Sequence, residues 1–549
     1  MKKFIKQNKA FVYFIIFYSI LLIFSIDNDP KNFANHAYHL EKAKLMSDGN
    51  GYSSIGIDGI VPESSITKFF FAFMISGVLK LFGNSFFYPR LFVAILSILS
   101  LILMYFIFEK RLSKKKRLLL ISLTALNFHY FTYSGFVETE IPYIFFTFIC
   151  IYLFDLYLKK EKISIIFFIG IFTVFTYLTR FIGMSLFIAI LLHLILNKTK
   201  KKLDFEIIKS NLKNTVFYGI ISSIILIIWS IRNKILGIGG IASNYLSPWM
   251  IFTPDWNTEK TYEISIIPII LKIIINIVGY LYFLPNLIFN GILSLKLNNF
   301  AHTVLESNNK LNFIINQDLN FLIYLGFYFF ISFILISIIF FGYFNQIKKK
   351  ITIIETYLFF NVAILMLYSD RVPRFLVALI PLIIYYLIKG MDKLIKNKII
   401  SKKIVSIFYI FLIIFSILSV FKITYEYKTN TEYDPNMKDF FDMALWANEN
   451  IDSNSIILTN GKIGLAFFTN LIELPIRTIE NSSELFKYID DNNVNYIIVD
   501  SLENMEWVHN WKYRTKKNII PTINKHPENF KEVHKIENTI LYEYDKNKK

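Results

Sequence analysis

Long apolar stretches recur through most of the chain, from residue 10 to residue 421. A run of about 17–25 apolar residues matches the roughly 30 Å thickness of the hydrocarbon core of a bilayer. Inside that core the backbone must satisfy its own hydrogen bonds, so such a run crosses as a helix. Composition agrees, because 54% of the residues are hydrophobic and the mean hydropathy is +0.46. The sequence therefore predicts an α-helical polytopic membrane protein.

The basic residues indicate the direction in which each helix crosses. The net charge of +18 comes largely from short clusters between apolar runs, such as Lys2–Lys9, Lys110–Arg117 and Lys389–Lys403. The positive-inside rule places these clusters in the cytoplasm, so the charge reports topology and indicates no nucleic-acid partner. We therefore expect spans at 10–26, 87–108, 118–134, 142–158, 163–179, 181–196, 214–231, 319–344, 352–368, 375–389 and 404–421.

Two stretches determine this threading, that is, the order and direction in which the helices cross the membrane. Residues 163–196 are too many for one helix and contain one charge, Arg180, so we expect two helices that meet at Arg180 on the outer side. Residues 265–289 are expected to be interfacial or re-entrant, since a further crossing would move the later basic clusters outside. The predicted fold for residues 1–421 is a bundle of about 11–13 transmembrane helices.

Residues 422–549 differ from the rest, because they are polar and mixed in composition. The apolar spacing at 437–451 is typical of a helix. Short β-rich runs at 455–459, 495–500 and 539–544 are bounded by Asn, Asp and Gly, which indicates strands. We expect a small α/β domain, and the threading makes it extracytoplasmic.

Ionisable residues gather on the side of the membrane that the threading makes external. The first external loop, 27–86, contains Asp27, Asp29, His36, His39 and Glu63. The second external loop, 135–141, contains Glu138 and Glu140, and the outer ends of helices add Arg180, Arg371 and Arg374. Ionisable groups at membrane depth are costly and usually face a cavity or a partner. The function is therefore expected at this face.

Acids beside arginines suggest chemistry on a lipid-linked phosphate. Guanidinium groups bind phosphate through paired charge-assisted hydrogen bonds, and a carboxylate can accept the proton of an attacking hydroxyl or amine. Simpler explanations also fit. Arg371 and Arg374 could snorkel to the interface or pair with Asp370, and Glu140 could stabilise the N-terminus of a helix. Glu138 is expected to be a bystander.

Four sequence segments, taken in order, resemble the membrane glycosyltransferases of the C-type (GT-C) superfamily. They are HAYHLEKAKLMSDGNGYS followed by FGNSFFYPRLF, ETEIPYIFFTFICIYLF, YLTRFIGMSL and RFLVALIPLIIYYL. The resemblance is to the protein O-mannosyltransferase and lipid A aminoarabinose transferase group, which is glycosyltransferase family 39-like. It covers residues 10–421, and the tail looks like the external C-terminal domain of that family.

The resemblance implies an inverting hexosyl or pentosyl transferase. It would move a sugar from a polyprenyl-phosphate-linked donor to lipid A, a surface glycan or a protein, at the outer face of a bacterial inner membrane. By motif, Glu140 and Glu63 match catalytic acids and Arg374 matches the phosphate-binding arginine, with Arg371 and Arg180 as further substrate-binding groups. Asn35 and His36 stand where the family has an Asp-Glu pair. Either Asp27, Asp29 or His36 supplies the missing group, or the protein is inactive or uses another donor.

Other cofactors and functions are compatible with parts of this pattern. His36 and His39 have a weak metal-binding spacing, so a divalent metal ion is the one cofactor left open, and no metal ligand is assigned. A lipid or solute transporter or flippase, or a non-catalytic envelope-assembly protein, would also place charges around a cavity. The sequence shows no internal repeat of the kind many transporters have, which favours the enzyme. The expected partners are the donor, the acceptor and membrane lipids.

Overall fold

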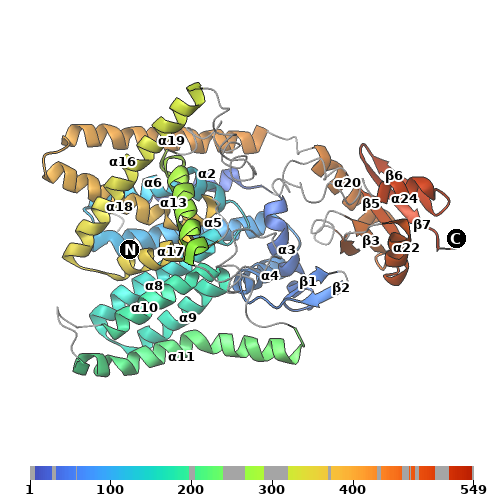
Figure 1. The fold of residues 1–549 in the computed structure, drawn as a ribbon, viewed down its shortest axis with the longest axis horizontal. Helices are drawn as coiled ribbons and strands as arrows, with labels where there is room; N and C mark the ends of the chain where they lie inside the picture. The colour runs from blue at the N-terminus through green and yellow to red at the C-terminus, as the bar shows by residue number, and fades with distance from the viewer. Residues whose placement is uncertain are drawn as a thin grey trace. The chain divides into compact units, whose positions relative to one another are not determined.

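A computed structural model describes residues 7–27, 33–56, 59–196, 205–238, 266–289, 319–368, 373–429, 435–459, 469, 471–475, 481–500 and 519–546. The chain divides into two compact units, and Figure 1 labels many of their helices and strands. The helical unit comprises Met1–Ile26, Ser64–Phe70 and Arg90–Glu426. The mixed unit comprises Asp27–Glu63, Phe71–Pro89 and Tyr427–Lys549, so the first external loop is grouped with the tail.

The helical unit consists of apolar helices, as the sequence predicts. Its α-helices are α2 (Lys9–Ser25), α5 (Phe87–Ile107), α6 (Lys114–Ala125), α7 (Phe128–Ser134), α8 (Glu140–Lys160), α9 (Ile163–Thr179), α10 (Met184–Ile195), α11 (Phe205–Ile235), α13 (Ile266–Ile288), α16 (Leu319–Lys349), α17 (Ile353–Leu367), α18 (Ile380–Lys396) and α19 (Lys402–Thr429). Three 3₁₀ segments connect some of them, η1 (Phe108–Lys110), η2 (Phe181–Gly183) and η4 (Pro373–Leu379).

Length and composition confirm the membrane character of these helices. In the described part of the chain, six stretches are long and apolar enough to cross a membrane, and six shorter helices are also apolar. The long ones are Phe87–Lys110, Glu140–Lys160, Asn211–Ile235, Gly326–Lys349, Pro373–Lys396 and Lys402–Glu426. The predicted α-helical polytopic fold is therefore confirmed.

Two apolar stretches are divided into separate helices by local chemistry. The stretch 118–134 is divided into α6 and α7, because the Asn127 side chain accepts hydrogen bonds from the backbone of His129 and Tyr130 at 3.1 and 3.3 Å and starts a new helix. The stretch 163–196 forms α9 and α10, which meet at Arg180 as expected. Gly183 allows this reversal, since a Cβ there would lie 2.7 Å from the Tyr177 nitrogen.

Close helix contact is concentrated where α16 crosses α18. A Cβ on Gly342 would lie 2.7 Å from the Gly390 nitrogen, and one on Gly390 would lie 2.8 Å from Cγ2 of Ile338. Small residues let two backbones approach in this way, which is a common device between membrane helices. Helix α13, in the stretch expected to be interfacial or re-entrant, packs against α16 and α17.

The mixed unit contains the predicted strands. Its elements are α3 (Phe33–Ser47), β1 (Ser53–Gly56), β2 (Gly59–Pro62), α4 (Phe69–Phe82), α20 (Pro435–Asn450), β3 (Ile456–Thr459), β4 (Ile472–Pro475), α22 (Ser482–Asp491), β5 (Tyr496–Val499), α24 (Ile520–Lys525), β6 (Phe530–Ile536) and β7 (Thr539–Tyr544). The first two residues of α4, Phe69 and Phe70, belong to the helical unit. The apolar helix α4 was not predicted.

The sheet of the mixed unit is five-stranded, in the order β4-β3-β5-β7-β6. Strands β4, β3 and β5 are parallel, whereas β7 is antiparallel to both β5 and β6. Apolar residues of the sheet, α22 and α24 form one core, including Ile497, Leu485 and Ile519, each of which is fully buried. Separately, β1 and β2 form an antiparallel hairpin that contacts β4.

Candidate active site

Two buried carboxylates lie at the point where the chain enters α8. Glu140 is the first residue of that helix, and Glu138 lies two residues before it. Their side chains are 1% and 3% exposed. A carboxylate at a helix N-terminus is stabilised by the unpaired backbone N–H groups and the helix dipole. That effect alone does not balance two buried acids, so nearby cations are required.

Arg180 supplies the first cation from the junction between α9 and α10. Its Nη1 donates to Oε1 of Glu140 and, at 3.1 Å, to the Thr139 hydroxyl. The guanidinium is mostly buried, with 12% of the side chain exposed. Arg180 therefore ties the turn after α9 to the start of α8, and one oxygen of Glu140 is occupied by this contact. Glu140 Oε2 has no hydrogen-bond partner among the described residues.

Arg374 supplies the second cation, from the second position of η4. Its Nε lies 3.4 Å from Oε1 of Glu140, and its Nη1 lies 3.8 Å from Oε1 of Glu138. One planar guanidinium therefore lies within reach of both acids. The Arg374 side chain is 32% exposed, in contrast to the 12% of Arg180, so it retains a face that a ligand could contact.

An aromatic ring lies beside both guanidinium groups. The centroid of Phe375 is 5.5 Å from Cζ of Arg180 and 5.9 Å from Cζ of Arg374. Cations within about 6 Å of a ring are attracted by its quadrupole. The ring thus helps to hold two like charges close together, in addition to the acids between them.

Lys68 is a third cation near the acids, and sequence reasoning missed it. Its charge acts on the Glu138 carboxylate. The residue has a φ of +69°, a left-handed conformation that is rare outside glycine and that is often found at functional sites. A signal was present in the sequence, since a single lysine begins the apolar run 69–82 inside a loop predicted to be external.

The two acids differ in their electrostatic environment. Burial has the largest effect on Glu138 and raises its pKa, while Arg374, Lys68 and Arg180 lower it by a smaller total amount. A carboxyl with a raised pKa binds a proton more readily than an ordinary glutamate does. Glu138, expected from the sequence to be a bystander, therefore has the property of a proton acceptor.

The remaining predicted residues lie elsewhere or outside the described residues. Glu63 forms an ion pair with Lys42, which is 1% exposed and lies 4.3 Å from the centroid of the Tyr38 ring. His39 packs edge-on against Tyr38 and Phe71, with ring centroids 5.4 and 5.1 Å away. Both residues belong to the mixed unit, as does the half-buried Asp27. The His36 backbone is in α3, whereas its side chain, Asp29 and Arg371 lie outside the described residues.

Both acids of the cluster lie beside the same guanidinium group. Glu138 and Glu140 each have a nitrogen of Arg374 within 4 Å. Within the described ranges, no group of three or more His, Cys, Asp or Glu side chains could hold a metal. The divalent metal ion therefore stays a prediction from the sequence.

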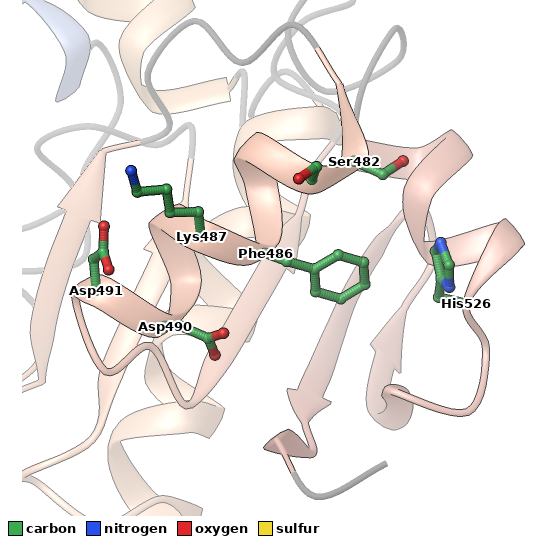
Figure 2. A pocket seen from close by; sticks show the side chains of 7 residues that line it. Ser482, Phe486, Lys487, Asp490, Asp491 and His526 are labelled. Atoms are coloured by element: carbon green, nitrogen blue, oxygen red, sulfur yellow. The ribbon is translucent and has the colours of Figure 1, made fainter. Parts of the chain in front are cut away.

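A separate pocket of about 580 Å³ lies on α22 of the mixed unit (Figure 2). It is lined by Ser482, Ser483, Phe486, Lys487, Asp490, Asp491 and His526. Figure 2 shows the Phe486 ring pointing toward His526, and their centroids are 5.1 Å apart. Asp490 accepts a hydrogen bond from the Tyr544 hydroxyl at 3.2 Å. The pocket lining contains no arginine, so the cluster around Glu138 is the better candidate for phosphate chemistry.

A family model matches part of the chain that includes most of this cluster. The family model described as dolichyl-phosphate-mannose-protein mannosyltransferase matches residues 67–236. This segment contains Lys68, Glu138, Glu140 and Arg180, which are four of the five charged residues of the cluster. The search of curated proteins found no match.

Solved structures are similar over nearly the whole chain. The archaeal oligosaccharyltransferase AglB from Archaeoglobus fulgidus, in complex with an inhibitory peptide and a dolichol-phosphate, is 11% identical with a TM-score of 0.55, over 99% of this chain and 75% of that one. ArnT from Cupriavidus metallidurans, bound to undecaprenyl phosphate, is 10% identical with a TM-score of 0.51, over 98% of both chains. The chain has the GT-C fold. The resemblance noted in the sequence is thereby confirmed at the level of the fold.

Proposed function

We propose that the chain is an integral membrane glycosyltransferase that uses a polyprenyl-phosphate-linked sugar donor. The observation that carries the proposal is the convergence of Glu138 and Glu140 with Arg374, Arg180 and Lys68 from separate segments of one unit. Two proteins with the same fold hold a dolichol-phosphate and an undecaprenyl phosphate, which supports this donor class. The acceptor is lipid A, a surface glycan or a protein, at the outer face of the cytoplasmic membrane.

Arg374 is the group best placed to hold the donor phosphate. Arg180 is committed to Glu140 and Thr139, whereas Arg374 is about one-third exposed and makes longer contacts to the acids. A planar guanidinium can donate two parallel hydrogen bonds to phosphate oxygens. Lys68 adds a second positive charge near the same carboxylate, which favours the extra negative charge of a leaving phosphate.

Glu138 is the proposed proton acceptor. The acceptor hydroxyl or amine attacks the anomeric carbon, and its proton passes to the Glu138 carboxylate as the new bond forms. The bond between the anomeric carbon and the phosphate oxygen breaks, and its electron pair leaves with the polyprenyl phosphate. A single displacement of this kind inverts the anomeric configuration. Glu140 keeps the arginines in place, because one of its oxygens is bound by Arg180.

The residues of the first loop remain in the proposal as alternatives for proton transfer. Asp27, Asp29 and His36 lie in the segment where the GT-C resemblance implies an acidic pair. If Asp29 is the acid, Asp29→Asn abolishes transfer and leaves donor binding nearly intact. If Glu138 is the acceptor, Glu138→Gln has that effect and Asp29→Asn does not. The two variants measured together therefore separate the two assignments.

Donor consumption by the purified full chain in nanodiscs tests the function. The chain is incubated with a panel of undecaprenyl-phosphate sugars together with lipid A, glycan or peptide acceptors, and released undecaprenyl phosphate is measured. We expect release with one donor and loss of release in Glu138→Gln. Glu355→Gln is the matched control, since Glu355 is also a buried glutamate of the helical unit but accepts a hydrogen bond from the backbone nitrogen of Thr352 at the start of α17. Transport of a lipid or solute without consumption of any donor would overturn the proposal and favour a transporter.

A further inference from the structure

The C-terminal end of α17 is capped by a side chain from another helix. Nδ2 of Asn276, on α13, donates to the backbone carbonyls of Leu365 at 3.3 Å, Met366 at 2.8 Å and Tyr368 at 2.8 Å. The Asn276 side chain is fully buried. The last carbonyls of a helix have no partner within it, and leaving them unpaired in an apolar environment is costly. Asn276 therefore sets where α17 ends.

The capped end contacts the aromatic ring beside the proposed phosphate-binding arginine. Tyr368 is the first residue after α17, and its ring packs edge-on against Phe375 with centroids 5.2 Å apart. Phe375 in turn lies beside the guanidinium groups of Arg374 and Arg180. Helix α13 also contacts η4, which carries Arg374. A continuous series of contacts thus runs from Asn276 through Tyr368 and Phe375 to the site.

We propose that Asn276 is a positioning residue for donor binding, acting through the end of α17 on the orientation of Arg374. The inference rests on the proposed function, because it assumes that Arg374 contacts the donor phosphate. Asn276 does not itself touch the substrate. A shift of the Tyr368 carbonyl moves the Tyr368 ring, and through it the Phe375 ring that supports the guanidinium.

Asn276→Leu is the direct test, because leucine is similar in size and has no donor. Asn361→Leu is the matched control. Asn361 is also buried, lies on α17 itself and donates to the hydroxyls of Tyr143, Ser185 and Tyr357 rather than to the end of the helix. Asn276→Ser is a milder variant, whose short hydroxyl reaches fewer carbonyls, in case the leucine variant does not fold.

The probe is a fluorescently tagged undecaprenyl phosphate, bound at equilibrium to the full chain in nanodiscs. We expect about a tenfold weaker Kd in Asn276→Leu, a smaller loss in Asn276→Ser, and a change below about twofold in Asn361→Leu. Turnover should show a raised KM for the donor with a smaller effect on kcat, which a purely structural defect would not produce. The thermal melting temperature of each variant reports folding separately.

The outcomes distinguish this inference from the function on which it rests. If the unmodified chain does not bind the tagged phosphate, the proposed function fails. If the unmodified chain binds it, and folded Asn276→Leu or Asn276→Ser binds equally well, then Asn276 has no positioning role. Equal weakening in Asn361→Leu would also overturn the inference, because the effect would then follow from loss of any buried asparagine on these helices.

Discussion

Replacement of Arg374 by lysine should weaken donor binding although the charge is unchanged. The Arg374 guanidinium uses two different nitrogens toward two acids, Nε at 3.4 Å from Glu140 and Nη1 at 3.8 Å from Glu138. A lysine ammonium is a single point charge, so it cannot reach both acids and also present a planar pair of donors to phosphate. The lysine variant still attracts an anion, but it loses the planar pair of donors that binds phosphate.

The magnitude follows from the hydrogen bond to phosphate that a lysine cannot replace. Losing one hydrogen bond to a charged group costs about 1.5–3 kcal/mol, which corresponds to roughly 10- to 150-fold in affinity. Because 32% of the Arg374 side chain is exposed, water screens part of this interaction. We therefore expect the lower part of that range, about 10- to 30-fold weaker binding of the donor.

The assay compares three variants in nanodiscs by titration with tagged undecaprenyl phosphate. Arg111→Lys is the matched control, because Arg111 forms a paired contact with Asp155 at 2.7 and 3.0 Å and is not part of the charged cluster. Arg371→Lys should be milder than Arg374→Lys, since the family resemblance matches Arg374 to the phosphate-binding arginine. Near-native affinity in Arg374→Lys, or an equal loss in Arg111→Lys, would refute the phosphate assignment.

Three further predictions concern pH, packing and topology. Because burial raises the pKa of Glu138, kcat/KM should begin to fall at a pH above the pKa range of an ordinary glutamate as the solution is acidified. Arg374→Gln should move this fall to still higher pH, because it removes a cation that lowers the pKa of Glu138. Gly390→Ala should lower the melting temperature, with a cost of about 1–3 kcal/mol for overpacking against α16, as a thermal scan would show. Cysteine labelling from outside should modify positions 32 and 481 and spare Lys115, and the native Cys150 is buried. Labelling at position 115 would contradict the threading.

The membrane helices could be predicted because their signal is local. The length of an apolar run indicates whether it can span the membrane, and the lysines that follow it indicate the direction in which it crosses. The turn at Arg180 was predictable for the same reason, since one charge divides a stretch that is too long for a single helix. The strands β3, β5 and β7 were recognised from short β-rich runs bounded by turn residues.

The pairing of charges could not be predicted, because it depends on contacts between distant segments. The sequence around Glu63 contains no signal that this residue forms an ion pair with Lys42. Glu138 was assigned no role, because its burial and its proximity to Lys68 depend on contacts between segments that are far apart in the sequence. The break at Asn127 is a local capping effect, but it is hidden within an apolar stretch where the hydropathy continues.

The order in which the chain is synthesised matters for the charged cluster. Glu140 meets Arg180 after 40 further residues, so that pair can form early as the helices enter the membrane. The contact between Glu138 and Arg374 can form only after η4 has been synthesised, because Arg374 belongs to η4 and is made much later. A nascent or truncated chain that ends before this point has Lys68 and Arg180 near Glu138 but lacks Arg374. A chain shortened before η4 should therefore be less stable in the membrane than the full chain.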